Sequence, residues 1–153
     1  SWPRSQRSRG VFMLLDFSFE KLKALAQMRM DDALLLLTQE RFSSAYYLAG
    51  YAVEIGLKAC IALQFRAEHL PDRRFVNMVY THQLEDLVSH AGLDDILAEK
   101  MDDDPEFSEN WSVACQWTPE SRYLTVDDPT ATRMVRAVSD PEKGILTWIR
   151  EYW

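Results

Sequence analysis

The longest helical pattern in the chain runs from Arg41 to Phe65, a stretch without proline in which small side chains recur in alternating steps of four and three residues. The recurring positions are Ala45, Ala49, Ala52, Gly56, Ala59 and Leu63. This spacing keeps them on one face of an α-helix. Because small side chains let a neighbouring backbone approach closely, we expect a central core helix that several other helices contact.

A second face of the same helix carries aromatic and charged side chains. These residues, which we call the polar strip, are Tyr47, Tyr51, Glu54 and Lys58. Glu54 precedes Lys58 by four residues, the favourable order for a helical ion pair, which contributes ~0.3–0.5 kcal/mol when it is exposed. The strip is either a solvated or dimer-buried surface, or one wall of a ligand site.

Periodic apolar positions elsewhere predict further helices, and no segment alternates as a β-strand does. One helix begins near Asp16 or Ser18 and continues through Leu37. The short joint Gln39-Glu40 then places it antiparallel to the central helix. Further helices are expected from Thr81 to Gly92, over 94–101, from Asp104-Pro105 to Trp117, over 130–138 and over 141–153, with loops over 66–82 and 118–130. The sequence therefore predicts an all-α bundle.

At 153 residues, the chain is long enough for one domain with its own core, which we expect over residues 16–153. Residues 1–15 are interpreted as an N-terminal extension or an added segment, with Met13 as a candidate natural start. The net charge of −7 argues against the extensive phosphate contacts of a duplex-DNA-binding domain.

The cysteines and the apolar runs indicate the compartment. Cys60 and Cys115 are the two cysteines, and the chain contains no CxxC motif. They are expected to be free thiols, as in a reducing cytoplasm. Uninterrupted apolar runs such as Ala33 to Leu37 are too short to cross a membrane.

Motifs for nucleophilic catalysis, phosphate loops and dinucleotide binding are missing: the chain contains no GxSxG, GxxxxGK[ST] or GxGxxG. Its three histidines lack the spacing of a zinc site. The acidic string from Asp102 to Glu109 lacks the glycine of a calcium loop, and acids around a helix N-terminus explain it better. We therefore expect no metal and no cofactor.

Two short segments carry further candidate ligand-binding groups. At Thr81-His82, a helix start offers free N–H groups to an anion, unless Thr81 simply caps the helix and His82 packs beside it. After Trp117, the neighbours Arg122 and Tyr123 can hold a phosphate and stack on a base. The alternative there is an Arg122 paired with an acid and a Tyr123 packed into the bundle.

Several of these strings resemble the HEPN family (higher eukaryotes and prokaryotes nucleotide-binding domain). The strongest is A-x-Y-x-x-x-x-A-V-E-x-x-L-K-A, here Ala45 to Ala59, followed by T-H-x-L at Thr81 to Leu84. ESRY at 120–123 and GILTWIREYW at 144–153 add to the resemblance, which covers about residues 18–153.

The resemblance implies an antiparallel up-and-down bundle of four main helices plus short helices, often a homodimer. Many such proteins accompany a small nucleotidyltransferase-like partner in bacterial toxin–antitoxin or defence pairs. Catalytic members are metal-independent ribonucleases marked by R-x(4–6)-H. Here two residues separate Arg66 from His69, and seven separate Arg74 from His82, so the motif transfers to no position.

We therefore expect a non-catalytic HEPN-like domain in the cytoplasm that binds a nucleotide, RNA or a protein partner, but neither duplex DNA nor a membrane. The expected ligand-binding residues are Tyr47, Tyr51, Glu54, Lys58, His82, Arg122 and Tyr123. The competing hypothesis is a ribonuclease toxin with a diverged set, Arg74, His82 and Arg122. A third is an antitoxin or assembly subunit that provides only a protein interface.

Overall fold

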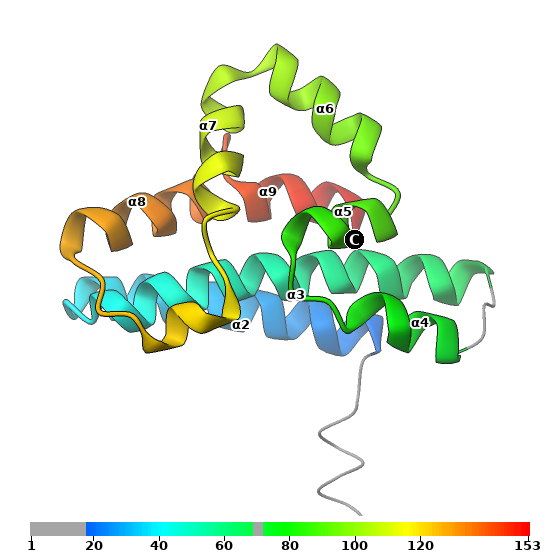
Figure 1. Ribbon diagram of the computed structural model, residues 1–153, viewed down its shortest axis with the longest axis horizontal. Helices are drawn as coiled ribbons and strands as arrows, with labels where there is room; N and C mark the ends of the chain where they lie inside the picture. Colours follow the sequence, from blue (N-terminus) through cyan, green and yellow to red (C-terminus); the bar gives the residue numbers. More distant parts are fainter. Residues whose placement is uncertain (1–17, 69–71) are drawn as a thin grey trace, which may run out of the picture.

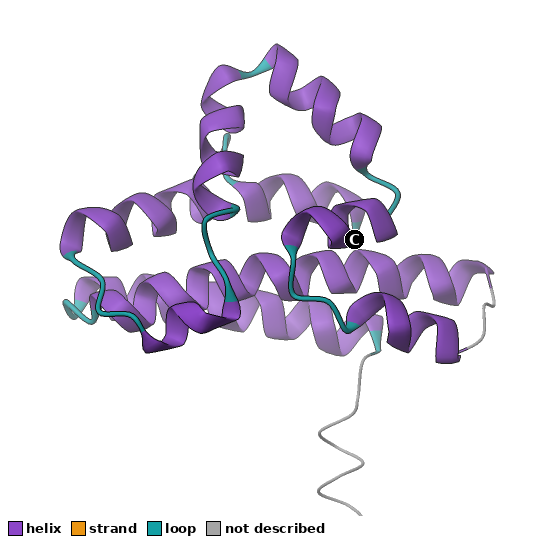
Figure 2. Cartoon of the chain, viewed as in Figure 1, coloured by secondary structure: helices purple, strands orange, loops and turns teal. Residues whose placement is uncertain are grey.

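A computed structural model describes residues 18–68 and 72–153, and these ranges form an all-α fold without β-strands (Figures 1 and 2). The predicted N-terminal segment 1–15 lies outside the described residues. The α-helices are α2 Phe19–Thr38, α3 Phe42–Glu68, α4 Asp72–Val79, α5 Leu84–His90, α6 Asp94–Asp103, α7 Pro105–Ala114, α8 Asp128–Ser139 and α9 Ile145–Ile149. Two 3₁₀ helices, η1 Pro119–Tyr123 and η2 Arg150–Tyr152, complete the described elements.

Helices α2 and α3 form the predicted antiparallel hairpin, the longest feature in Figure 1. Ser18 caps α2, because its hydroxyl accepts a hydrogen bond from the Lys21 N–H at 3.3 Å. At the far end, Glu40 takes a positive φ of 58°, and the Arg41 N–H donates to the Leu36 carbonyl at 2.9 Å. This tight turn reverses the chain and lets α3 begin at Phe42.

Helix α3 is the predicted centre of the fold. The small residues Ala45, Ala49, Ala52, Gly56 and Ala59 are all buried. Helices α2, α4, α5, α8 and α9 and the η1 turn all contact α3. Neighbouring helices therefore pack against the small side chains along most of α3.

By length and composition, α3 could also cross a membrane: its segment Phe42–Arg66 has a mean hydropathy of 1.3. However, 78% of the apolar window is buried inside the fold. Packing against neighbouring helices therefore accounts for the apolar character of α3 without a bilayer.

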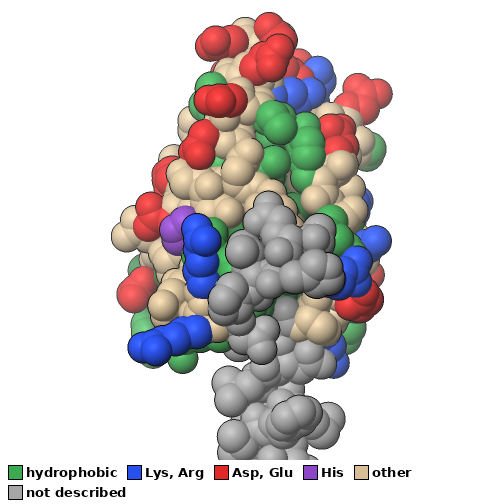
Figure 3. Space-filling model, turned by 90° about the vertical axis from the view of Figure 1, so that its right-hand side faces the viewer, with side chains coloured by type: hydrophobic (Ala, Val, Ile, Leu, Met, Phe, Trp, Pro, Cys, Tyr) green, Lys and Arg blue, Asp and Glu red, His purple; other side chains and the backbone are tan. Residues whose placement is uncertain are grey.

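Helices α6 and α7 stand at one end of the molecule, away from the hairpin (Figure 1). Figure 3 shows acidic side chains gathered over this end. As expected from the sequence, Asp104 caps α7: its Oδ1 accepts a hydrogen bond from the Phe107 N–H at 3.2 Å. Its Oδ2 lies 2.7 Å from the Lys143 Nζ, so the capping carboxylate also ties α7 to the segment before α9.

The sequence prediction was wrong for three short elements. Residues 72–79 form α4 rather than a loop, and Phe75 of this helix packs against Phe65 with ring centroids 5.3 Å apart. The second predicted loop contains η1. The last helix begins at Ile145 and not at Pro141, because the Asp140 carboxylate accepts hydrogen bonds from the N–H groups of residues 142 and 143 and holds a turn there.

Candidate functional site

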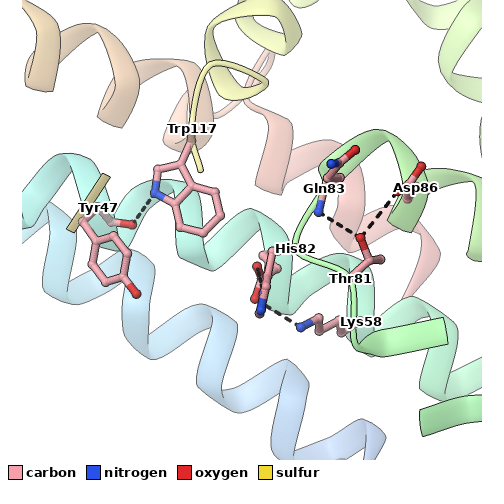
Figure 4. Close-up of polar contacts among 8 residues, drawn as sticks. Tyr47, Lys58, Thr81, His82, Gln83, Asp86 and Trp117 are labelled. Carbon is pink, nitrogen blue, oxygen red and sulfur yellow. Dashed lines mark hydrogen bonds and ion pairs between the residues drawn. The ribbon is translucent and has the colours of Figure 1, made fainter. Parts of the chain in front are cut away.

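The polar strip of α3 meets the segment between α4 and α5 at a buried carboxylate. Glu54 is only 2% exposed. Its Oε1 lies 2.8 Å from the Nδ1 of His82, and its Oε2 accepts a hydrogen bond from the Lys58 Nζ at 3.2 Å. Figure 4 shows this chain of polar contacts beside α3. One carboxylate thus holds two side chains that are far apart in the sequence.

Glu54 and Lys58 form the predicted ion pair, and the pair is buried within the fold. Lys58 is 8% exposed, so its ammonium is committed to Glu54 rather than available to a ligand. The imidazole of His82, in contrast, is 56% exposed. Because Nδ1 faces Glu54, Nε2 is the ring nitrogen left for an external partner.

The start of α5 also differs from the prediction. Helix α5 begins at Leu84, and Thr81 does not cap it: the Thr81 hydroxyl accepts from the Gln83 N–H at 3.2 Å and bonds Asp86 at 3.5 Å. Glu85 and Asp86 already bring negative charge to the first turn. This negative charge disfavours an anion at the helix start, and the anion site there stays a prediction.

Aromatic rings occupy the strip on the other side of Glu54. The Tyr51 and Trp117 rings are stacked, with centroids 6.2 Å apart and an interplanar angle of 14°. The Trp117 Nε1 donates a hydrogen bond to the Tyr47 carbonyl at 3.0 Å. Burial, followed by the charge of Glu54, raises the pKa of Tyr51. The rings and the carboxylate therefore form one continuous wall.

Arg122 and Tyr123 lie in η1 at the end of this wall. The Arg122 guanidinium carbon is 4.9 Å from the centroid of the Tyr123 ring, and Tyr123 is 77% exposed. The alternative of a Tyr123 packed into the bundle is therefore not observed. Hydrogen bonds to the phenol oxygens of Tyr123 and, more weakly, Tyr47 raise the pKa of Arg122. Through Tyr47, Arg122 belongs to the same surface as the strip.

A cavity of about 420 Å³ opens next to His82. It lies between residues 80–85 on one side and Cys115 with residues 117–120 on the other. Of the seven sequence-predicted site residues, only His82 lines it. The carboxylates of Glu85 and Glu120 in its walls were missed, because no local pattern indicates that these two segments meet.

In the described part of the chain, no three histidine, cysteine, aspartate or glutamate side chains gather as a metal site would require. Comparisons of the chain with protein-family models, with curated proteins and with solved structures found no match.

Proposed function

We propose that this chain is a HEPN-like helical domain that binds a nucleotide or single-stranded RNA along α3, between His82 and Arg122, without cutting it. The observation that carries the proposal is the contact between Glu54 and His82. It joins the two strings on which the family resemblance rests, Ala45–Ala59 and Thr81–Leu84, in a single polar cluster. A buried carboxylate that fixes an exposed imidazole is suited to positioning a ligand-binding group.

The chemistry of the exposed groups supports a nucleotide ligand. His82 Nε2 and the Arg122 guanidinium can contact phosphate oxygens, and the exposed ring of Tyr123 offers a stacking surface. Stacking on an aromatic side chain contributes about 1–3 kcal/mol per base. Glu54 and Lys58 then act as positioning residues, while Tyr47 and Tyr51 support the wall beneath the ligand.

The biological setting of the proposal comes from the family resemblance alone. It comprises a cytoplasmic homodimer arranged as four main helices, encoded beside a nucleotidyltransferase-like partner in a bacterial toxin–antitoxin or defence pair. Identification of the neighbouring reading frame tests this setting directly.

Binding is tested by fluorescence anisotropy with labelled nucleotides and short oligoribonucleotides. We expect saturable binding that His82→Ala and Arg122→Ala each weaken by about fivefold, the effect of one lost charged contact. Arg136→Ala, which removes an exposed arginine from α8, is the control and should bind normally. Failure of every nucleic acid probe to bind would reject the function, whereas binding unaffected by both site variants would reject the site.

The second candidate function is a metal-independent ribonuclease that uses Arg74, His82 and Arg122. The specific observation in its favour is the 2.8 Å contact of Glu54 with Nδ1, which leaves Nε2 of His82 in the orientation of a general acid or base. Induced expression in bacteria, followed by RNA-integrity gels, discriminates between the two functions. RNA degradation that persists in chelator and disappears in His82→Ala would replace the non-catalytic proposal.

A further inference from the structure

The cavity beside His82 differs in chemistry from the rest of the candidate site. Its walls contain two carboxylates, Glu85 and Glu120, and two large aromatic side chains, Tyr80 and Trp117. None of the lining residues is lysine or arginine. The Tyr80 ring is 72% exposed, so its face is open to a ligand. A phosphate entering this cavity would meet two negative charges and only one imidazole.

Glu85 faces Cys115 across the cavity, since both residues line it. Burial is the main cause of the raised pKa of Cys115, and the charge of Glu85 and its hydrogen bond with the thiol raise that pKa further. The acidic side chain of Glu85 therefore adds negative charge to the space between the two walls. Glu120 belongs to the same wall as Cys115, so the side chains of Glu85 and Glu120 both line this cavity.

We propose that this cavity binds the cationic side chain of an arginine or lysine in a basic segment of a partner protein. Carboxylates hold a guanidinium through charge-assisted, often bidentate hydrogen bonds. A cation over the exposed Tyr80 ring is further attracted by the negative face of the aromatic system. The net charge of −7 attracts a basic segment from a distance.

The size of the cavity agrees with such an occupant. Its volume of about 420 Å³ is within the range of ligand pockets and accommodates a long basic side chain with part of its backbone. His82, in the segment before α5, lines the cavity, and its Nδ1 contacts Glu54 of α3. A seated basic segment covers the imidazole, so partner binding and access to His82 exclude one another. This inference rests on the cavity walls and stands independently of RNA binding.

The test uses a fluorescent glycine–arginine peptide, the same peptide with lysine, and a version with citrulline, which has the shape of arginine but no charge. We expect saturable binding of the two cationic peptides by the full chain, and at least about tenfold weaker binding of the citrulline peptide. The double variant Glu85→Gln/Glu120→Gln should weaken binding of the arginine peptide by about tenfold, because amides cannot supply the two negative charges. The indole N–H resonance of Trp117 should shift on titration, which locates the peptide.

The matched control is Glu109→Gln/Glu142→Gln, which removes the same charge from exposed positions elsewhere. Both double variants are checked by circular dichroism for an unchanged helical fold. Equal affinity for the citrulline peptide, or equal weakening by the control variant, overturns the proposal. Oligoribonucleotide binding that strengthens in Glu85→Gln/Glu120→Gln, without any peptide binding, overturns it in favour of a nucleic acid ligand.

Discussion

The indole of Trp117 lies directly against the backbone of Gly50. A Cβ atom on residue 50 would be 2.2 Å from the Cδ1 and Cγ atoms of the ring. The same indole donates a hydrogen bond to the carbonyl of Tyr47, one turn earlier in α3. The segment before η1 is therefore anchored to the central helix through a site that only glycine can provide, and this anchor supports the wall of the candidate site.

We predict that Gly50→Ala destabilises the fold. Alanine is the better helix former by about 0.5–1 kcal/mol, but its methyl group would displace the Trp117 ring. Overpacking of this kind typically costs about 1–3 kcal/mol, so the free energy of unfolding should fall on balance. Urea denaturation measures this change.

Gly56→Ala is the matched comparison for Gly50→Ala. A Cβ at residue 56 would lie 3.1 Å from Cδ1 of Leu146 and 3.3 Å from Cγ2 of Ile149, both ends of adaptable side chains. Its effect on stability should therefore be the smaller of the two. A Gly50→Ala protein as stable as the unmodified chain would contradict the packing described above.

Removal of the buried charge of Glu54 alone should lower the free energy of unfolding more than removal of both charges of the Glu54–Lys58 ion pair. Glu54→Gln leaves Lys58 buried without an anion, a loss of about 3–5 kcal/mol for a pair that is broken on one side. The double variant Glu54→Gln/Lys58→Met should lose less free energy of unfolding than the two single variants lose in sum. Chemical denaturation in a double-mutant cycle gives the coupling energy.

Arg136→Ala provides the control for this cycle, because the arginine is exposed on α8 and its removal opens no core cavity. We expect its stability to remain within about 1 kcal/mol of the unmodified chain. Additive effects of the Glu54 and Lys58 substitutions would show that the two charges do not interact.

Acid should weaken the anchor between Asp104 and Lys143. A hydrogen bond from Lys143 is the main cause of the lowered pKa of Asp104, and the Phe107 N–H and Lys100 contribute to it. Since the folded state holds this proton less readily than the unfolded chain, the ion pair stabilises the fold above the ordinary carboxyl pKa of 3.8. This stability is lost as the pH falls through the lower folded value.

Asp104→Asn isolates this effect, because asparagine caps helices about as well as aspartate but carries no charge. The unmodified chain should melt at a higher temperature than Asp104→Asn at about pH 7, and the difference should disappear well below pH ~4. Thermal melts across this range measure it. A difference in melting temperature that is independent of pH would exclude the ion pair as its source.

The thiol of Cys60 should be inert in the folded protein. Burial raises the pKa of this thiol to about 12, so almost no thiolate is present at about pH 8. Thiol-reactive reagents should modify Cys60 only after unfolding in guanidinium, as located by mass spectrometry of peptides. Rapid labelling of Cys60 in the native chain would mean that the core opens around α3.

The helix α3 and its hairpin with α2 could be predicted because patterns of residues close together in the sequence indicate both. Small residues such as Ala49 and Ala52 repeat with the helical period, and Ser18 and Asp104 mark helix starts. Helix α4 and η1 could not be predicted in this way. They are too short to show a period, and contacts such as Phe75 on Phe65 hold α4 in place.

For the candidate site, the sequence by itself determined that Tyr47, Tyr51, Glu54 and Lys58 share one side of a helix, because their spacing follows the helical repeat. Only the tertiary structure decided that Glu54 and Lys58 are buried, that His82 bonds to Glu54, and that Trp117 rests on Gly50. These contacts join residues that are 28 and 67 positions apart in the chain. Burial and pairing over such separations depend on how the segments pack, and local side-chain patterns do not encode that packing.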